Sequence, residues 1–201
     1  MWDQRYNRDE YVYGTEPNSF LSEQSHRLSE DSQILTLCEG EGRNAVYLAG
    51  LGHQVTGVDG STVGLEKARK LAALNAVEIK TRVTDLSHFE PGNSCWDAVV
   101  SIFAHVPPVV RQQIHKRVVR ALRPGGLLIL EAYTPEQIGR GTGGPPDEKL
   151  MMNLESLEEE LDGLEFLLAE EKLRPVNEGF GHTGDGHVVQ LIAKKPGTKN
   201  H

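Results

Sequence analysis

Apolar and polar residues follow two different rhythms along this chain. Short runs rich in leucine and β-branched residues occur as QILTLC, HQVTGVD, VEIKTRVTD, WDAVVSIF and GLLILEAY. Between them lie stretches with a helical period, the clearest being PVVRQQIHKRVVRAL, where Val110, Ile114 and Val118 are four residues apart. Such alternation is typical of a parallel sheet with helices on both faces. In this last helix we expect the basic residues, including Arg111 and Arg117, to face water.

The pattern changes in the last quarter of the chain. LEFLLAEEKLR and HVVQLIAKK both resemble strands and are joined by PVNEGFGHTGDG without a helical stretch, so they should pair antiparallel. We therefore predict an α/β fold with a Rossmann-like, doubly wound, mostly parallel seven-stranded sheet, an antiparallel terminal hairpin strand and helices on both faces. Two further helices are expected, one from Thr134 in TPEQ and one from near Ser156 to Gly163.

Length and composition predict one domain. The 201 residues, with 38% hydrophobic and 25% charged residues, suffice for one core but not for two ordinary ones. We expect an N-terminal arm and helix capping the ligand site (1–30), an α/β core (31–195) and a tail (196–201).

Charge and cysteine content limit the partners. The formal net charge of -8 disfavours a nucleic-acid substrate, and the apolar stretches are too short to cross a membrane. Two cysteines give no disulfide framework, and the start of the chain does not resemble a signal peptide, so we expect a cytoplasmic protein. We expect a small-molecule substrate and a monomer or weak homodimer.

The turn CEGEGRN joins the first strand to the following helix and contains Gly40 and Gly42. Glycine there permits positive φ and a close ligand approach at the carboxyl ends of the strands, where open α/β sheets bind ligands. With Ala45 and Asp59, the spacing also fits a dinucleotide fingerprint, so a nicotinamide-dependent oxidoreductase is an alternative.

Acidic neighbours of this turn argue for a different ligand. Glu39 and Glu41 flank Gly40 and would oppose a pyrophosphate, whereas they would favour a cation.

Five motifs along the chain resemble, in the same order, those of class I S-adenosylmethionine-dependent methyltransferases. They are GEGRNAVYLA, VTGVDGS, VTDL, WDAVVSIFAHVP and LRPGGLLILEAY. The segments WDQRYNRDEYVYGTEPNSFL and HTGDGHVVQLIAKK resemble the tellurite-resistance and thiopurine-type branch. The resemblance covers nearly the whole chain. It implies S-adenosylmethionine as cofactor, bound by residues of the arm and of the strand ends: Tyr13, Gly14, Glu39, Gly40, Glu41, Gly42, Asn44, Asp59, Gly60, Ser61, Asp85, Leu86, Phe103 and Ala104.

The chain departs from the family pattern in the first strand. The usual aspartate is Thr36 here, and the first glycine of the turn and its neighbour are Cys38 and Glu39. We expect Cys38 to be a buried packing residue and Glu39 to hold the ammonium group of the cofactor's methionine moiety.

Histidines near the predicted hairpin are candidate acceptor-site residues. His182 and His187 belong to the loop after strand six and its exit, and His105 follows strand four, so we expect all three at one rim as catalytic residues. Arg174, and Arg140 in the glycine-rich segment 139–146, are candidate substrate-binding residues, the latter on a mobile lid. The alternative for each histidine is a surface position without function.

We expect no metal, because the donors of HTGDGH lie on a loop and not at helical spacing. The remaining histidines of the helices and turns are expected at the surface: His26, His53, His88 and His115.

The sequence thus predicts methyl transfer to a small soft nucleophile, such as a tellurite or selenite oxyanion, a thiol or a thiopurine-like compound. Besides the oxidoreductase, a binding module that holds the cofactor without catalysis stays open.

Overall fold

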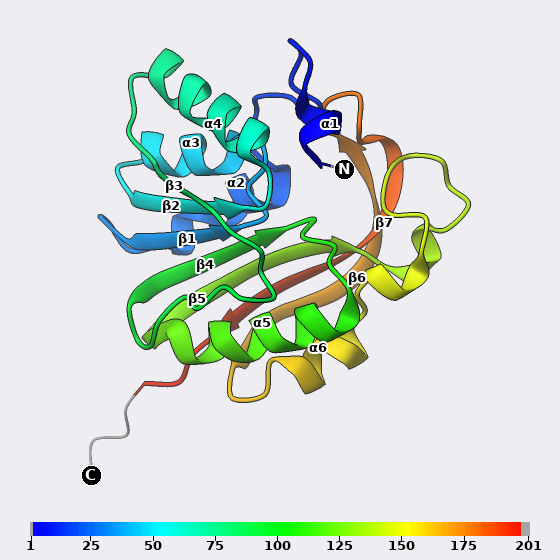
Figure 1. Ribbon diagram of the computed structural model, residues 1–201. Helices are drawn as coiled ribbons and strands as arrows, with labels where there is room; N and C mark the ends of the chain where they lie inside the picture. Colours follow the sequence, from blue (N-terminus) through cyan, green and yellow to red (C-terminus); the bar gives the residue numbers. More distant parts are fainter. Residues whose placement is uncertain (1, 198–201) are drawn as a thin grey trace.

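A computed structural model describes residues 2–197, so most of the predicted tail lies outside the described residues. One seven-stranded sheet runs through the molecule in the order β3-β2-β1-β4-β5-β7-β6 (Figure 1). Its strands are β1 (Gln33–Leu37), β2 (Gln54–Asp59), β3 (Lys80–Val83), β4 (Trp96–Ile102), β5 (Leu122–Tyr133), β6 (Glu165–Asn177) and β7 (Thr183–Lys194). The first five are parallel, and β7 pairs antiparallel with both β5 and β6. The predicted fold class is confirmed.

Helices cover both faces of the sheet. The α-helices are α1 (Trp2–Tyr6), α2 (Ser19–Gln24), α3 (Arg43–Gly50), α4 (Thr62–Leu74), α5 (Pro108–Ala121) and α6 (Leu154–Glu160), and the 3₁₀ turns are η1 (Ser25–Arg27), η2 (Pro135–Gln137) and η3 (Glu148–Leu150). Figure 1 shows α2, α3 and α4 on one side and α5 and α6 on the other. No helix within residues 2–197 combines the length and the apolar character that a membrane span needs.

Apolar side chains form a core layer on each face. Ile129 and Ile192 pack with Leu21 of α2 on one face, whereas Leu128 and Leu191 belong to the layer beneath α5 and α6 on the other. Adjacent residues of a strand point to opposite faces of the sheet, so an isoleucine and the leucine next to it pack in different core layers. Burial of each such side chain contributes about 1.5–3 kcal/mol.

Helix α5 keeps its apolar period but not all of its predicted solvent face. Ile114 and Val118 are buried as expected, yet Arg111 and His115 are buried too. Both bind Glu160 of α6, with Arg111 Nε 3.0 Å from Oε1 and His115 Nδ1 2.7 Å from Oε2. The predicted surface positions of Arg111 and His115 are therefore wrong, because a carboxylate on the neighbouring helix draws both inward.

The two short predicted helices differ from expectation in extent. The stretch after Thr134 forms only the single turn η2, since the Thr134 hydroxyl donates to the Glu136 carboxylate instead of capping a helix. Helix α6 begins at Leu154 because Asn153 caps it, with its side chain accepting from the Ser156 N–H.

Candidate active site

The turn between β1 and α3 needs both of its glycines. Gly40 has φ +61° and Gly42 has φ +96°. A Cβ on Gly42 would lie 2.6 Å from Ala68 Cα of α4, so this glycine allows α3 and α4 to pack closely. At Gly40, a Cβ would lie 2.7 Å from the Tyr6 hydroxyl of α1. The turn thus leaves bare backbone beside the ends of β1 and β2, as the sequence indicates.

Asp59 ends β2 directly beside this turn. Its carboxylate accepts from Gly40 N–H at 2.9 Å and from Ser61 N–H at 2.7 Å, and it is 7% exposed. Burial raises the pKa of Asp59, although the backbone N–H groups oppose that rise. Gly60 and Ser61 follow at the start of α4, where the Ser61 side chain caps the helix. A carboxylate held in this way is suited to accept hydrogen bonds from ligand hydroxyl groups.

Glu39 and Glu41 have roles in the fold that the motif does not suggest. Glu39 accepts from Ala45 N–H at 2.9 Å and so caps α3, while burial raises its pKa to about 7. Glu41 accepts from Val12 N–H at 2.8 Å and pairs with Lys67 Nζ of α4 at 2.5 Å. It thereby fastens the N-terminal arm to α4. Contact of either carboxylate with a cofactor stays a prediction.

The N-terminal arm lies over the strand ends. Tyr6 is buried on the glycine turn, and the Tyr13 ring lies 4.5 Å from the His182 ring, while Gly14 adopts φ +71° beside Gly179. Tyr6 is a site residue that the sequence analysis missed. The aromatic spacing in WDQRYNRDEYVY was the available signal. Further back, the Asn44 side chain accepts from Asn18 N–H and anchors the end of the arm.

Some of the residues that follow β3 and β4 lie at the candidate site, and others are buried in the core. Asp85 is exposed and binds Ser87 N–H, whereas the Leu86 side chain is buried in the layer beneath α5. Phe103 has φ +51°, and its ring lies 4.6 Å from both the Tyr133 and the His182 rings; Ala104 is buried beside it.

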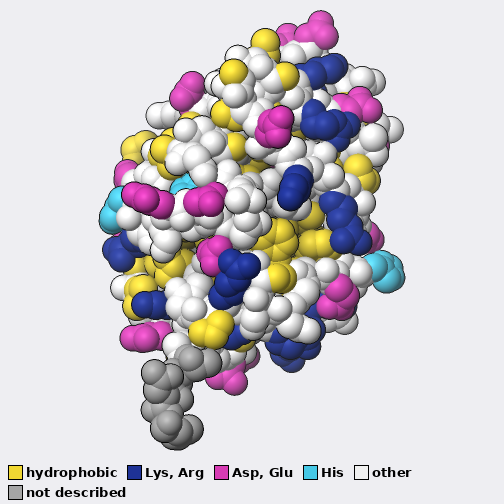
Figure 2. Space-filling view, turned by 90° about the vertical axis from the view of Figure 1, so that its left-hand side faces the viewer, with side chains coloured by type: hydrophobic (Ala, Val, Ile, Leu, Met, Phe, Trp, Pro, Cys, Tyr) yellow, Lys and Arg dark blue, Asp and Glu magenta, His cyan; other side chains and the backbone are white. Residues whose placement is uncertain are grey.

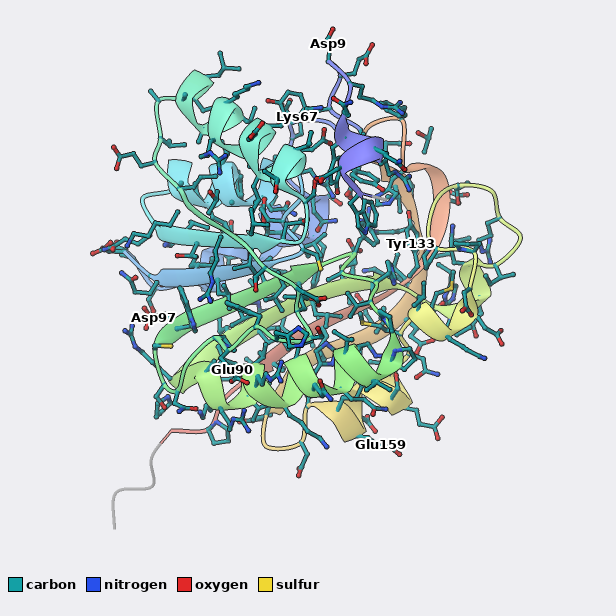
Figure 3. All side chains as sticks on the ribbon, in the orientation of Figure 1. Asp9, Lys67, Glu90, Asp97, Tyr133 and Glu159 are labelled. Atoms are coloured by element: carbon teal, nitrogen blue, oxygen red, sulfur yellow. The ribbon has the colours of Figure 1, made fainter. Side chains whose placement is uncertain are left out.

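His182 lies at the centre of an aromatic cluster made by Tyr13, Phe103 and Tyr133. Tyr133 ends β5 where the arm, segment 139–146 and the β6–β7 loop meet (Figure 3). His182 is 6% exposed, and its Nδ1 has no hydrogen-bond partner within the described chain. Burial, and then the charge of Arg43, lower its pKa to about 3. The imidazole is therefore neutral and can make a hydrogen bond to a ligand through Nδ1.

Both ring nitrogens of His105 make hydrogen bonds to the backbone. Its Nδ1 lies 3.0 Å from the Leu150 carbonyl oxygen, and its Nε2 accepts from Tyr133 N–H at 3.3 Å. Burial lowers its pKa to about 4. In this structure His105 fixes the positions of η3 and of the end of β5, and its catalytic role stays a prediction.

His187 does not share the rim with His182. Val188 packs with Tyr133, whereas Val189 belongs to the layer beneath α5 and α6, so strand alternation places His187 on that second face. There, His187 Nδ1 lies 2.6 Å from the Thr134 hydroxyl. The prediction of three histidines at one rim is wrong, because the register of the hairpin could not be inferred from composition.

Arg174 is a counter-ion within the fold. Its Nε and Nη2 bind the two Glu131 carboxylate oxygens at 2.6 Å each, and Nη2 also lies 2.9 Å from Glu178. Since Glu131 is fully buried, Arg174 is committed to neutralising it, and the predicted substrate contact is corrected. A larger network surrounds this pair and was not foreseen from sequence: Asn18, Arg43, Glu131, Arg174, Glu178 and Gln190.

Segment 139–146 packs onto the aromatic cluster. A Cβ on Gly143 would lie 2.9 Å from both the Tyr133 hydroxyl and His182 Cδ2. Arg140 is exposed and donates to the Glu136 carbonyl oxygen, so its substrate contact stays a prediction. On the other face of the sheet, Glu136 and His187, with Glu171, offer one donor atom each within 4.8 Å of one another. The expectation of no metal is not tested by this arrangement.

Comparisons with known proteins identify the type of domain. A family model described as a methyltransferase domain matches residues 34–126. A tRNA (uracil(54)-C(5))-methyltransferase of Pyrococcus abyssi is 28% identical over 155 residues, covering 70% of this chain and 36% of the relative. A 2-heptyl-1-hydroxyquinolin-4(1H)-one methyltransferase of Mycobacteroides abscessus is 26% identical over 109 residues, covering 53% and 48%. The chain spans less than half the length of either curated relative.

A solved structure supports the same fold. The TehB-like SAM-dependent methyltransferase of Corynebacterium glutamicum superposes with a TM-score of 0.65 at 21% identity, covering 96% of this chain and 91% of that one. The family model covers a little under half of the chain and, with these relatives, supports a methyltransferase domain with S-adenosylmethionine as its cofactor. The oxidoreductase alternative is left without support.

The residues at the glycine turn fit this cofactor. The buried Asp59 carboxylate suits the ribose hydroxyl groups, and the bare backbone at Gly40 and Gly42 allows the cofactor to approach the strand ends closely. Tyr6 covers Gly40, so α1 must share this position with the cofactor or move.

Proposed function

We propose that this methyltransferase domain acts on a small soft nucleophile: a tellurite or selenite oxyanion, a thiol or a thiopurine-like compound, as in the tellurite-resistance and thiopurine-type branch. The observation that carries the proposal is His182, a buried neutral imidazole enclosed by three aromatic rings beside the cofactor turn. A site of this kind suits a small acceptor that must be desolvated and aligned.

Alignment is the main task of the protein in this reaction. When bound, S-adenosylmethionine supplies an electrophilic methyl group on a sulfonium sulfur, which becomes a neutral thioether when the acceptor's lone pair displaces it. Asp59 and the glycine turn hold the cofactor, the aromatic rings exclude water from the acceptor, and His182 Nδ1 orients the acceptor through a hydrogen bond. Positioning of this kind lowers a barrier by about 7–11 kcal/mol in favourable cases.

Hydroxylated heteroaromatic compounds are a second candidate class of acceptor. The Tyr13, Phe103 and Tyr133 rings around His182 offer apolar contacts that suit an aromatic acceptor. One relative is named for methylation of a hydroxyquinolone, which agrees with this preference.

Nucleic acid fits less well, although another relative is named for tRNA. The net charge is -8, and acidic and basic side chains are interspersed on the face shown in Figure 2. We also propose a cytoplasmic monomer or weak homodimer without membrane partners; the free cysteines Cys38 and Cys95 agree with a reducing compartment.

Incubation with cofactor labelled in its methyl group tests the proposal. The panel comprises tellurite, selenite, a thiopurine, aliphatic and aromatic thiols and a hydroxyquinoline, with tRNA as the negative arm. We expect label in at least one small acceptor and loss of that product in His182→Ala. Label in tRNA alone would overturn the proposal, and binding of cofactor without any product would favour a non-catalytic binding module.

A further inference from the structure

Three polar atoms lie buried and unpartnered near the end of β5. Within residues 2–197, Arg43 Nη1, the Tyr133 hydroxyl and His182 Nδ1 have no hydrogen-bond partner. Their side chains are 7%, 0% and 6% exposed. An unsatisfied buried polar group costs about 1–3 kcal/mol, so three of them together call for a ligand.

The three atoms belong to one cluster although their residues are far apart in sequence. The Tyr133 and His182 rings lie 5.4 Å apart, and both flank the position that a Cβ on Gly143 would occupy. Arg43 begins α3 directly after the cofactor turn and binds Glu178, whose backbone N–H donates to the His182 carbonyl oxygen at 2.9 Å. The cluster therefore lies between the cofactor turn and segment 139–146.

Charged groups of both signs surround this cluster. Basic groups act on His182, chiefly Arg43, whereas Glu178 and Glu131 act on Tyr133 together with Arg174. The nearest buried carboxylates are already bound: Glu131 by Arg174, Asn18 and Gln190, and Glu178 by Arg43, Arg174 and Asn18. Because Glu178 engages Arg43 only through Nη2, the other guanidinium nitrogen stays available.

We propose that Arg43 Nη1, the Tyr133 hydroxyl and His182 Nδ1 form an anion-binding subsite that takes the methyl acceptor in its ionised form. This inference rests on the proposed function and narrows it: thiolates, phenolates and oxyanions are accepted, whereas neutral compounds of the same shape are rejected. Guanidinium binds anions strongly through its fixed donors, and the aromatic rings supply the apolar remainder of the subsite. Entry requires segment 139–146 to move off Tyr133 and His182.

Calorimetric titration of the protein, saturated with S-adenosylhomocysteine, tests the subsite without catalysis. Benzoate and selenite represent a planar organic anion and an inorganic oxyanion, and benzamide is the neutral counterpart of benzoate. We expect at least one anion to bind, and benzoate to bind roughly tenfold or more tightly than benzamide, as expected for a charged hydrogen bond. Benzamide binding as tightly as benzoate, or no binding by either anion, would overturn the inference.

The variants Tyr133→Phe and Arg43→Lys test whether the anion binds at this subsite. Each substitution should weaken anion binding roughly tenfold. The thermal midpoint of Tyr133→Phe should stay the same or rise, because the hydroxyl that is removed has no partner. The control is Tyr47→Phe, which removes a hydroxyl bonded to Ser22 and Ser25 and should leave anion binding unchanged. Wild-type anion affinity in both site variants would overturn the assignment.

The panel of acceptors separates this inference from the proposed function. Anion binding that depends on Tyr133 and Arg43, without methylation of any acceptor, would refute the function and keep the subsite. Methylation with an unchanged acceptor KM in both variants would refute the subsite and keep the function.

Discussion

The two halves of the site hold their buried charges by different means. On the cofactor side, the carboxylates of Glu39 and Asp59 accept hydrogen bonds from backbone N–H groups of the turn and of the following helices. On the acceptor side, Glu131 and Glu178 are bound by side chains of the arm, α3, β6 and β7. The first arrangement is local in sequence and the second is assembled by the tertiary fold.

This difference matches the ligands that each half is suited to bind. Asp59, held by neutral N–H groups and not by a counter-ion, keeps its charge available beside the turn, which suits a cofactor with hydroxyl groups and a sulfonium cation. On the acceptor side the arginines and carboxylates pair with one another, so what favours an anion there is the unused donors, Arg43 Nη1 and the Tyr133 hydroxyl. The two halves would therefore bring a cationic methyl donor and an anionic acceptor together.

The comparison predicts its largest effect at Arg174. Arg174→Met leaves the fully buried Glu131 without its main counter-ion and should lower the free energy of unfolding by about 3–5 kcal/mol. The control is Lys172→Met on the same strand, whose pair with Glu170 is exposed and should contribute less than about 1 kcal/mol. Urea unfolding measures both. If Arg174 bound substrate instead, the variant would keep its stability and raise the acceptor KM.

On the cofactor side, the second-largest effect is expected from a substitution of Gly42. Gly42→Ala places a Cβ 2.6 Å from Ala68 Cα at a φ of +96° and should destabilise the protein by about 2–4 kcal/mol. Gly52 has a similar φ, +92°, but open space around it, so Gly52→Ala should cost only about 1 kcal/mol. Equal unfolding midpoints for the two variants would show that helix packing does not require the glycine.

Asp59 tests the separation of roles between the halves. Asp59→Asn should weaken S-adenosylhomocysteine binding about 100-fold, since two charge-assisted hydrogen bonds to ribose are lost at about 1.4 kcal/mol each. His182→Ala should bind the same ligand as tightly as the unmodified protein. Calorimetry gives both dissociation constants, and equal losses would contradict the division into cofactor and acceptor sides.

The same division explains what could be read from the sequence. The alternation of short strands and helices defines the sheet, and the cofactor turn is a continuous stretch, so Gly40, Gly42 and Asp59 could be assigned before the structure. Their partners lie close in sequence or on the adjacent strand. The fold and the cofactor side were predictable for this reason.

The acceptor side depends on contacts that no local pattern specifies. Asn18 and Glu178 are 160 residues apart, and the salt bridge from Arg174 to Glu131 became visible only when β7 was placed between β5 and β6. His187 was assigned to the wrong face because the register of the hairpin decides its orientation. Tyr133 was missed because a tyrosine ending a core strand carries no sequence signal for ligand binding.

The smallest predicted effect concerns Glu39, whose charge is opposed by few partners. Burial raises its pKa to about 7 from an ordinary 4.5, so between these values the native state keeps a proton that the unfolded chain has released. Its contribution to stability is therefore complete below the unfolded pKa and is lost as the pH rises to about 7. From pH 5.5 to 6.5 the loss is about 1.2 kcal/mol.

Glu39→Gln removes this titration and keeps a side-chain oxygen for Ala45 N–H. The difference in unfolding free energy between the unmodified protein and the variant should therefore shift by about 1.2 kcal/mol between pH 5.5 and 6.5, in favour of the variant at the higher pH. Urea unfolding at both pH values measures it, and the subtraction cancels the histidines, which titrate in both proteins. A constant difference would mean that the bond from one backbone N–H keeps Glu39 ionised, as the side-chain ion pairs do for carboxylates on the acceptor side.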